Sequence, residues 1–191
     1  MRKNLRISLV AMASAAVGLT FTPSIASAAP AELIPDQGYL NCIDDELGLD
    51  RGTQPTKTQL AGIAELQCGP TDSDTEYVSV GSTAGSQYMT GLTQLGINSY
   101  DLTDLDDIGS APKLKDLNLS RGQSYEPYEP YDLDFSPVGN SRSLQSLTLD
   151  GTPVDASPIA KASDLTNLEM GFTNETLEDL SGMTQLKTLR L

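Results

Sequence analysis

The 191-residue chain contains no histidine, the side chain that most often serves as a catalytic base. Without it the chain cannot form a Ser-His or Cys-His pair, in which the imidazole takes the proton of the nucleophile. The sequence also has no glycine-rich phosphate loop, and no carboxylate pair, such as Asp106 and Asp107, is distinguished as a general acid and base. We therefore expect a protein that is not an enzyme and uses no cofactor.

The apolar run at residues 7–21 is shorter than the roughly 20 residues that span a bilayer. Three basic residues precede it, and Pro23 and the small-residue sequence Ala-Ser-Ala at 26–28 follow it. This order is typical of a secretory signal peptide. We expect cleavage after residue 28, giving a secreted chain without a membrane span, in the medium or associated with the cell wall. An uncleaved membrane anchor is the alternative.

Basic residues are scarce. The chain has 12 lysines and arginines against 26 aspartates and glutamates, a net charge of −14. Residues 1–28 hold three basic and no acidic residues, so their removal leaves 9 basic and 26 acidic residues, or −17. Such a surface repels phosphate backbones and anionic membranes, so nucleic acid is not an expected partner.

Only two cysteines are present, Cys42 and Cys68. They lack the C-x-x-C spacing of redox-active pairs, and two thiols without histidine do not complete a zinc site, so no metal site is expected. An even number of cysteines in an exported chain indicates a disulfide, and two cysteines allow one intramolecular pairing. We expect a bond between Cys42 and Cys68.

The chain does contain a six-residue apolar motif that occurs five times in residues 92–191, and we call this motif the phrase. Its starts, at residues 92, 114, 144, 165 and 186, lie 22, 30, 21 and 21 residues apart, and apolar residues occupy its first, fourth and sixth positions. Self-similarity with a period in the low twenties is typical of a solenoid, whose units bury their apolar faces by stacking.

Alternation within each phrase predicts a β-strand with inward leucines, such as Leu117 and Leu119, and outward polar residues. Apolar residues between the strands, such as Leu102, Leu105 and Ile108, can fill the core from the opposite side. The outward positions form a polar strip without large aromatic residues. Its members include Gln94, Asn98, Asp116, Asn118, Ser146, Thr148, Asp150, Asn167, Glu169, Thr188 and Arg190.

The repeat resembles the short leucine-rich repeat of bacterial internalin-type proteins, LxxLxLxxNxIxDIxPLxxLxx. The unit from Leu92 keeps this register, with Asp104 and Leu105 at the Asp-Ile positions, and residues 154–159 are a version one residue shorter. The resemblance covers about residues 36–191. The asparagine of the pattern is replaced, which predicts a less regular solenoid; the replacements are Tyr100, Gly122, Thr152 and Thr173.

The resemblance implies a leucine-rich repeat solenoid with a parallel sheet, irregular or short helical returns and a helical N-terminal cap. It also implies that a ligand binds the concave sheet face, that is, the polar strip above. A solvated strip without a ligand is the alternative.

Residues 29–68 have the pattern of such a cap. Asp36 is placed to cap a helix that ends near Gly48, and Thr56 with Gln59 forms a capping box for a second short helix. Residues 63–68 then predict a first strand. Residues 69–91 are expected to form one irregular repeat.

An insert at residues 123–131 lengthens one repeat. It contains a duplicated Tyr-Glu-Pro triplet, and its prolines favour an extended, projecting loop. Tyr125, Tyr128 and Tyr131 are candidate contacts for a partner, because tyrosine offers a large contact area at low entropy cost. Packing of these rings against the solenoid is the alternative.

The sequence stops at Leu191 within a repeat. This favours a fragment of a longer protein, and self-association through the open strand edge is the alternative. Together these patterns favour an extracellular binding module for a protein, or alternatively a glycan. A structural spacer, or the N-terminal part of a larger cell-surface adhesin, is the competing interpretation.

Overall fold

The computed structural model describes residues 32–70, 78–121, 132–171 and 173–191. The predicted signal peptide and the insert tyrosines Tyr125, Tyr128 and Tyr131 lie outside the described residues, so these predictions remain untested.

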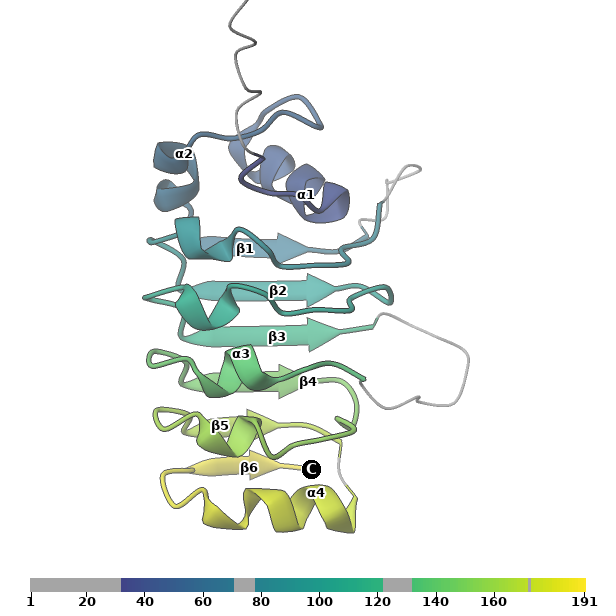
Figure 1. Ribbon diagram of the computed structural model, residues 1–191, viewed down its shortest axis with the longest axis vertical. Helices are drawn as coiled ribbons and strands as arrows, with labels where there is room; N and C mark the ends of the chain where they lie inside the picture. Colours follow the sequence, from purple (N-terminus) through teal and green to yellow (C-terminus); the bar gives the residue numbers. More distant parts are fainter. Residues whose placement is uncertain (1–31, 71–77, 122–131, 172) are drawn as a thin grey trace, which may run out of the picture. The chain divides into compact units, whose positions relative to one another are not determined.

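Six β-strands form one parallel sheet in which the spatial order is the order of the chain (Figure 1). The strands are β1 (Glu65–Cys68), β2 (Gln94–Asn98), β3 (Asp116–Ser120), β4 (Ser146–Leu149), β5 (Asn167–Glu169) and β6 (Thr188–Arg190). Each strand adds one layer to the stack, which confirms the predicted solenoid with a parallel sheet.

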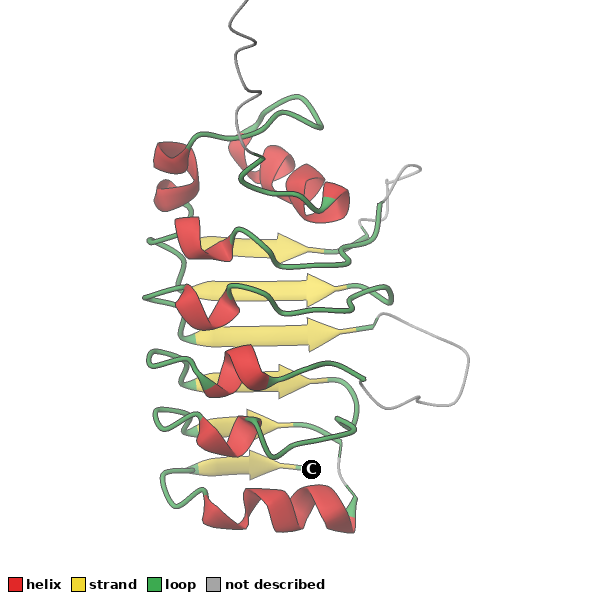
Figure 2. Ribbon diagram, viewed as in Figure 1, coloured by secondary structure: helices red, strands yellow, loops and turns green. Residues whose placement is uncertain are grey.

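Short helices occupy the return segments, on the side of each layer away from its strand (Figure 2). They are η1 (Ser86–Tyr88), η2 (Ile108–Ser110), α3 (Ser136–Gly139), η3 (Ile159–Lys161), α4 (Asn174–Asp179) and η4 (Leu180–Gly182). Where 17 residues separate one strand from the next, as between β2 and β3 and between β4 and β5, the return has room for only one or two helical turns, which accounts for the short helices.

Inward leucines of the strands and apolar residues of the returns share one core. The strand register aligns five leucines that are almost fully buried: Leu66, Leu95, Leu117, Leu147 and Leu168. The predicted contribution from the return side is confirmed, because Leu102, Leu105 and Ile108 are buried in the same core. Each buried leucine contributes about 1.5–3 kcal/mol through removal of apolar surface from water.

An aspartate begins the inward turn of three returns. Asp104, Asp134 and Asp155 each accept a hydrogen bond from the backbone amide two residues later, at 3.1, 2.8 and 2.8 Å. Hydrogen bonds from the Ser136 hydroxyl and amide hold the pKa of Asp134 below its usual range, and those from Ser157 do the same for Asp155. The turn then places the next apolar residue in the core.

Neighbouring return segments pack closely at Gly139, and a substitution there tests this packing. A Cβ at Gly139 would clash with the carbonyl oxygen of Pro158, whereas a Cβ at Gly182 would meet nothing within 4 Å. We expect Gly139→Ala to lower the free energy of unfolding by about 1–3 kcal/mol, because backbone must shift to admit the methyl group. The matched Gly182→Ala should change it by less than about 1 kcal/mol. Urea denaturation checks both, and equal midpoints would contradict the close packing.

Helices α1 (Gln37–Leu47) and α2 (Lys57–Gly62) cover the β1 end of the sheet (Figure 1). The side chain of Asp36 accepts a hydrogen bond from the amide of Tyr39 at 2.7 Å, and Gly48 ends α1 in the left-handed conformation. Thr56 and Gln59 form both hydrogen bonds of the capping box at the start of α2. The three predicted cap signals are therefore confirmed.

A disulfide between Cys42 and Cys68 joins α1 to β1, with 5.5 Å between the two Cα atoms. A second contact, a buried hydrogen bond, joins α1 to η1. The hydroxyl of Ser86 donates to the carbonyl oxygen of Thr83 at 2.7 Å, so the Tyr39 hydroxyl donates to Ser86 Oγ at 2.9 Å. Burial raises the pKa of Tyr39 above its usual range, so this hydroxyl keeps its proton.

Candidate functional site on the outward sheet face

The parallel register sets the outward side chains in two straight rows, which we call the outward face. The first row is Glu65, Gln94, Asp116, Ser146, Asn167 and Thr188, and the second is Gln67, Gly96, Asn118, Thr148, Glu169 and Arg190. Neighbouring strands of a sheet lie about 4.8 Å apart. One ligand can therefore contact several members of a row at once.

Nine of the eleven residues predicted for the polar strip lie in these two rows. The other two stand at strand ends: Asn98 pairs in register with Ser120, and Asp150 directly follows β4. The Asp150 carboxylate accepts a hydrogen bond from the backbone amide of Arg121 at 2.7 Å. Asp150 therefore ties together the chain segments that leave β3 and β4.

The sequence-based prediction missed two members of the face, Glu65 and Gln67 of β1. Residues 63–68 had been predicted as a strand, and the register with β2 would have placed both residues outward. Gln67 lies over Gly96, where a Cβ would clash with the Gln67 side-chain oxygen. The missing side chain at Gly96 thus leaves a gap in the second row that Gln67 enters.

A hollow of about 280 Å³ lies beside this gap, over β2, β3 and β4, and we call it the large hollow. Its lining residues are Gln67, Gln94, Leu95, Asp116, Leu117, Asn118, Ser146 and Thr148. Among the residues that the structure describes, none forms a hydrogen bond with the side chains of Asp116, Asn118, Ser146 or Thr148. These groups are therefore open to a ligand.

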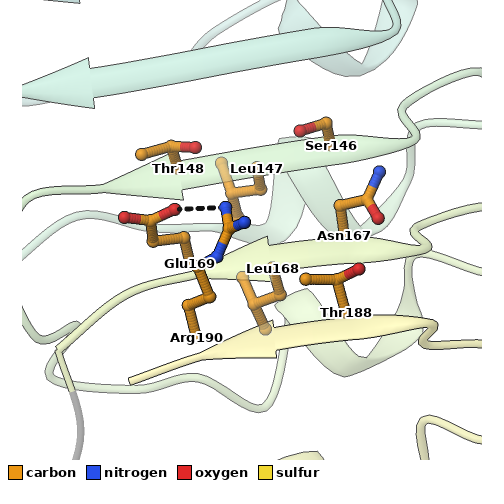
Figure 3. A pocket seen from close by; sticks show the side chains of 8 residues that line it. All are labelled: Ser146, Leu147, Thr148, Asn167, Leu168, Glu169, Thr188 and Arg190. Atoms are coloured by element: carbon orange, nitrogen blue, oxygen red, sulfur yellow. Dashed lines mark hydrogen bonds and ion pairs between the residues drawn. The ribbon is translucent and has the colours of Figure 1, made fainter.

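A smaller hollow of about 50 Å³ lies over β4, β5 and β6 (Figure 3). Figure 3 shows Arg190 of β6 reaching to Glu169 of β5, and the nitrogen–oxygen distance is 3.3 Å. The two side chains are 72% and 50% exposed. An ion pair this exposed contributes at most about 1 kcal/mol to stability, so a ligand can separate it at low cost.

The chemistry of the face is that of recognition through hydrogen bonds and charge. It presents amides, hydroxyls and carboxylates, all of which can accept hydrogen bonds, and Arg190 is the one cation of the two rows. Within the described ranges, no cluster of three or more cysteine or carboxylate side chains is arranged to hold a metal ion. No helix in the described part of the chain has both the length and the apolar character to cross a membrane.

No protein-family model and no curated protein sequence matches this chain significantly. Solved structures are similar to it. Internalin C2 from Listeria monocytogenes is 24% identical, with a TM-score of 0.57, over 82% of this chain and 64% of that one. InlP from Listeria monocytogenes is 19% identical, with a TM-score of 0.55, over 83% of this chain and 45% of that one. The chain thus spans less than two thirds of either structure, and over that span it has an internalin-like leucine-rich repeat fold.

Proposed function

We propose that the chain is an extracellular, non-enzymatic binding module that holds a protein ligand against the outward face. The observation that carries this proposal is the set of unengaged hydrogen-bonding groups that the register aligns on β3 and β4. Because neighbouring strands lie about 4.8 Å apart, one ligand can contact several of these groups at once.

The free energy of single hydrogen bonds favours a protein ligand over a small molecule. A single hydrogen bond contributes about 0.5–1.5 kcal/mol net, whereas micromolar affinity requires about 8.2 kcal/mol. Several contacts must therefore form together. The two rows extend over six strands, and stable protein interfaces bury about 800 Å² on each partner. An extended, shallow polar surface of this kind suits a protein, with a glycan as the second candidate.

Two features support an extracellular setting. The N-terminal 28 residues have the pattern of a cleaved secretory signal, and the chain forms a Cys42–Cys68 disulfide, which persists in oxidising compartments. The acidic surface keeps such a protein soluble and away from anionic membranes. A structural spacer remains the competing function, and it differs in predicting that the outward face tolerates any soluble substitution.

Blocking the face separates the two functions. Asn118→Arg with Thr148→Arg adds two long side chains beside the large hollow, and Ser110→Arg with Thr184→Arg adds the same charge on the returns. We would measure saturable retention of each labelled protein on immobilised extracellular proteins from the culture that produces it. We expect the face variant to lose at least about tenfold in affinity and the return variant to match the wild type. Equal retention of both variants, or none for the wild type, would favour the spacer.

A further inference from the structure

We propose that the large hollow binds a basic side chain, best an arginine, presented by the protein ligand. This inference rests on the proposed function and names the chemistry of one contact within it. It is carried by three properties of the hollow: its charge, its hydrogen-bonding groups and its size.

The charge of the face is uneven along the sheet. The outward positions of β1, β2 and β3 hold two carboxylates, Glu65 and Asp116, and no lysine or arginine. Both carboxylates belong to the first row, with Gln94 between them. The face therefore has a negative end, and the large hollow lies there with Asp116 in its lining.

The cation of the face does not neutralise this end. Arg190 of β6 places its charge beside Glu169 of β5, two strands from β3, which corresponds to about 10 Å across the sheet. That distance exceeds the Debye length of about 8 Å at physiological ionic strength. Arg190 is moreover paired with Glu169. An incoming cation at the large hollow therefore meets Asp116 without a competing positive charge from the rows.

The hollow has several acceptors for a ligand that only donates, and its one charged group, Asp116, accepts only. An arginine side chain has five N–H donors and no acceptor. The hollow offers the Asp116 carboxylate, the amide oxygens of Gln94 and Asn118, and the hydroxyl oxygens of Ser146 and Thr148 as acceptors. A carboxylate ligand would instead meet Asp116 as a like charge. A fork-shaped guanidinium can reach Asp116 and a neighbouring row at the same time.

The size of the hollow suits a long side chain. One water molecule requires about 10–15 Å³ of such space, and the large hollow offers about 280 Å³. The smaller hollow offers only about 50 Å³. The large hollow extends over the outward side chains of four strands, from Gln67 of β1 to Ser146 and Thr148 of β4. The large hollow can thus admit the head of an arginine together with waters.

The test uses two capped tripeptides, acetyl-Ser-Arg-Ser-amide and its citrulline counterpart, which has nearly the same shape without the charge. Each is titrated into the full, disulfide-bonded chain, and amide chemical shifts are followed by NMR. We expect the arginine peptide to shift the resonances of β2, β3 and β4 with a millimolar Kd. The citrulline peptide should bind about tenfold more weakly or not at all, because its uncharged head group can still donate to Asp116 but forms no ion pair with it.

Two variants locate the contact. Asp116→Asn keeps the size of the side chain and removes its charge, and it should weaken arginine-peptide binding about tenfold. Asp106→Asn removes an exposed carboxylate from a return segment and should leave binding unchanged. Equal binding of both peptides, an unchanged Kd in Asp116→Asn, or shifts confined to other strands would overturn the inference. Retention of an extracellular protein that depends on Asn118 and Thr148 but not on Asp116 would overturn it too, while leaving the proposed function intact.

Discussion

Replacing both Cys42 and Cys68 with serine is expected to lower the free energy of unfolding by about 3.5 kcal/mol. The disulfide closes a loop of 26 residues, and the chain-entropy relation gives about this value for a loop of that length. In the folded chain the bond ties α1, which covers the end of the solenoid, to β1, on which the first layer is built. Without it the unfolded chain gains conformations that the oxidised chain cannot visit.

Equilibrium denaturation with and without a reducing agent checks this prediction. Reduction should bring the wild type to the stability of the double variant and leave the double variant unchanged, which controls for effects of the reducing agent on other groups. Identical unfolding curves for the wild type under oxidising and reducing conditions would contradict a stabilising role for the bond.

Leu147→Ala is expected to cost about 2–5 kcal/mol of unfolding free energy. Leu147 is fully buried, and its neighbours in register, Leu117 and Leu168, are buried in the same core. Removing three carbons there forfeits their transfer free energy and leaves a cavity between layers that are held by their own strands. Because stacked layers support one another, the loss also weakens the interfaces on both sides of β4.

The matched control is Leu189→Ala in β6. Leu189 pairs in register with Leu168 and holds the same place in its repeat as Leu147, but it is 44% exposed. We expect a smaller cost of about 1 kcal/mol, because nearly half of the residue's surface is already in contact with water. Chemical denaturation of the two variants gives the comparison. Equal costs would show that burial between layers is not what stabilises the stack.

The layer architecture could be predicted from the sequence because one pattern sets it repeatedly. Inward apolar residues at positions four and six of each phrase are buried when the phrases lie side by side, and five occurrences favour a stack of layers. The same reasoning gave the capping of α1 by Asp36 and of α2 by Thr56, since these signals are local. The pairing of Cys42 with Cys68 followed from their number alone.

Contacts between segments far apart in the chain could not be predicted in this way. Ser86 occupies a return position that holds Ile108 and Ile159 in other layers, and a serine there looks like a defect in the repeat. The role of Ser86 depends on Tyr39, 47 residues away in the chain. Inside the core, Ser86 Oγ accepts a hydrogen bond from the Tyr39 hydroxyl. A repeat pattern describes how one layer contacts the next, and it contains no information about the cap.

On the outward face, too, local features could be predicted from the sequence and contacts between strands could not. Alternation predicted which side chains point away from the core, since that depends on neighbours in sequence. The large hollow depends on how Gln67 lies against Gly96 and on the register of β1 with β2, which no single strand shows. The predicted strip also omits Glu65 and Gln67, although alternation around Leu66 and Cys68 in the predicted first strand places both side chains outward.

Photo-cross-linking from the outward face tests the central claim most directly. p-Benzoylphenylalanine would replace Asn118 on β3 in one protein and Ser110 on a return in another, and both would be irradiated with the extracellular proteins of the producing culture. The account predicts a discrete adduct from position 118 that is lost when Thr148→Arg is added, and none from position 110. An adduct from position 110 alone, or the same adducts from both positions, would show that the outward face is not the ligand site.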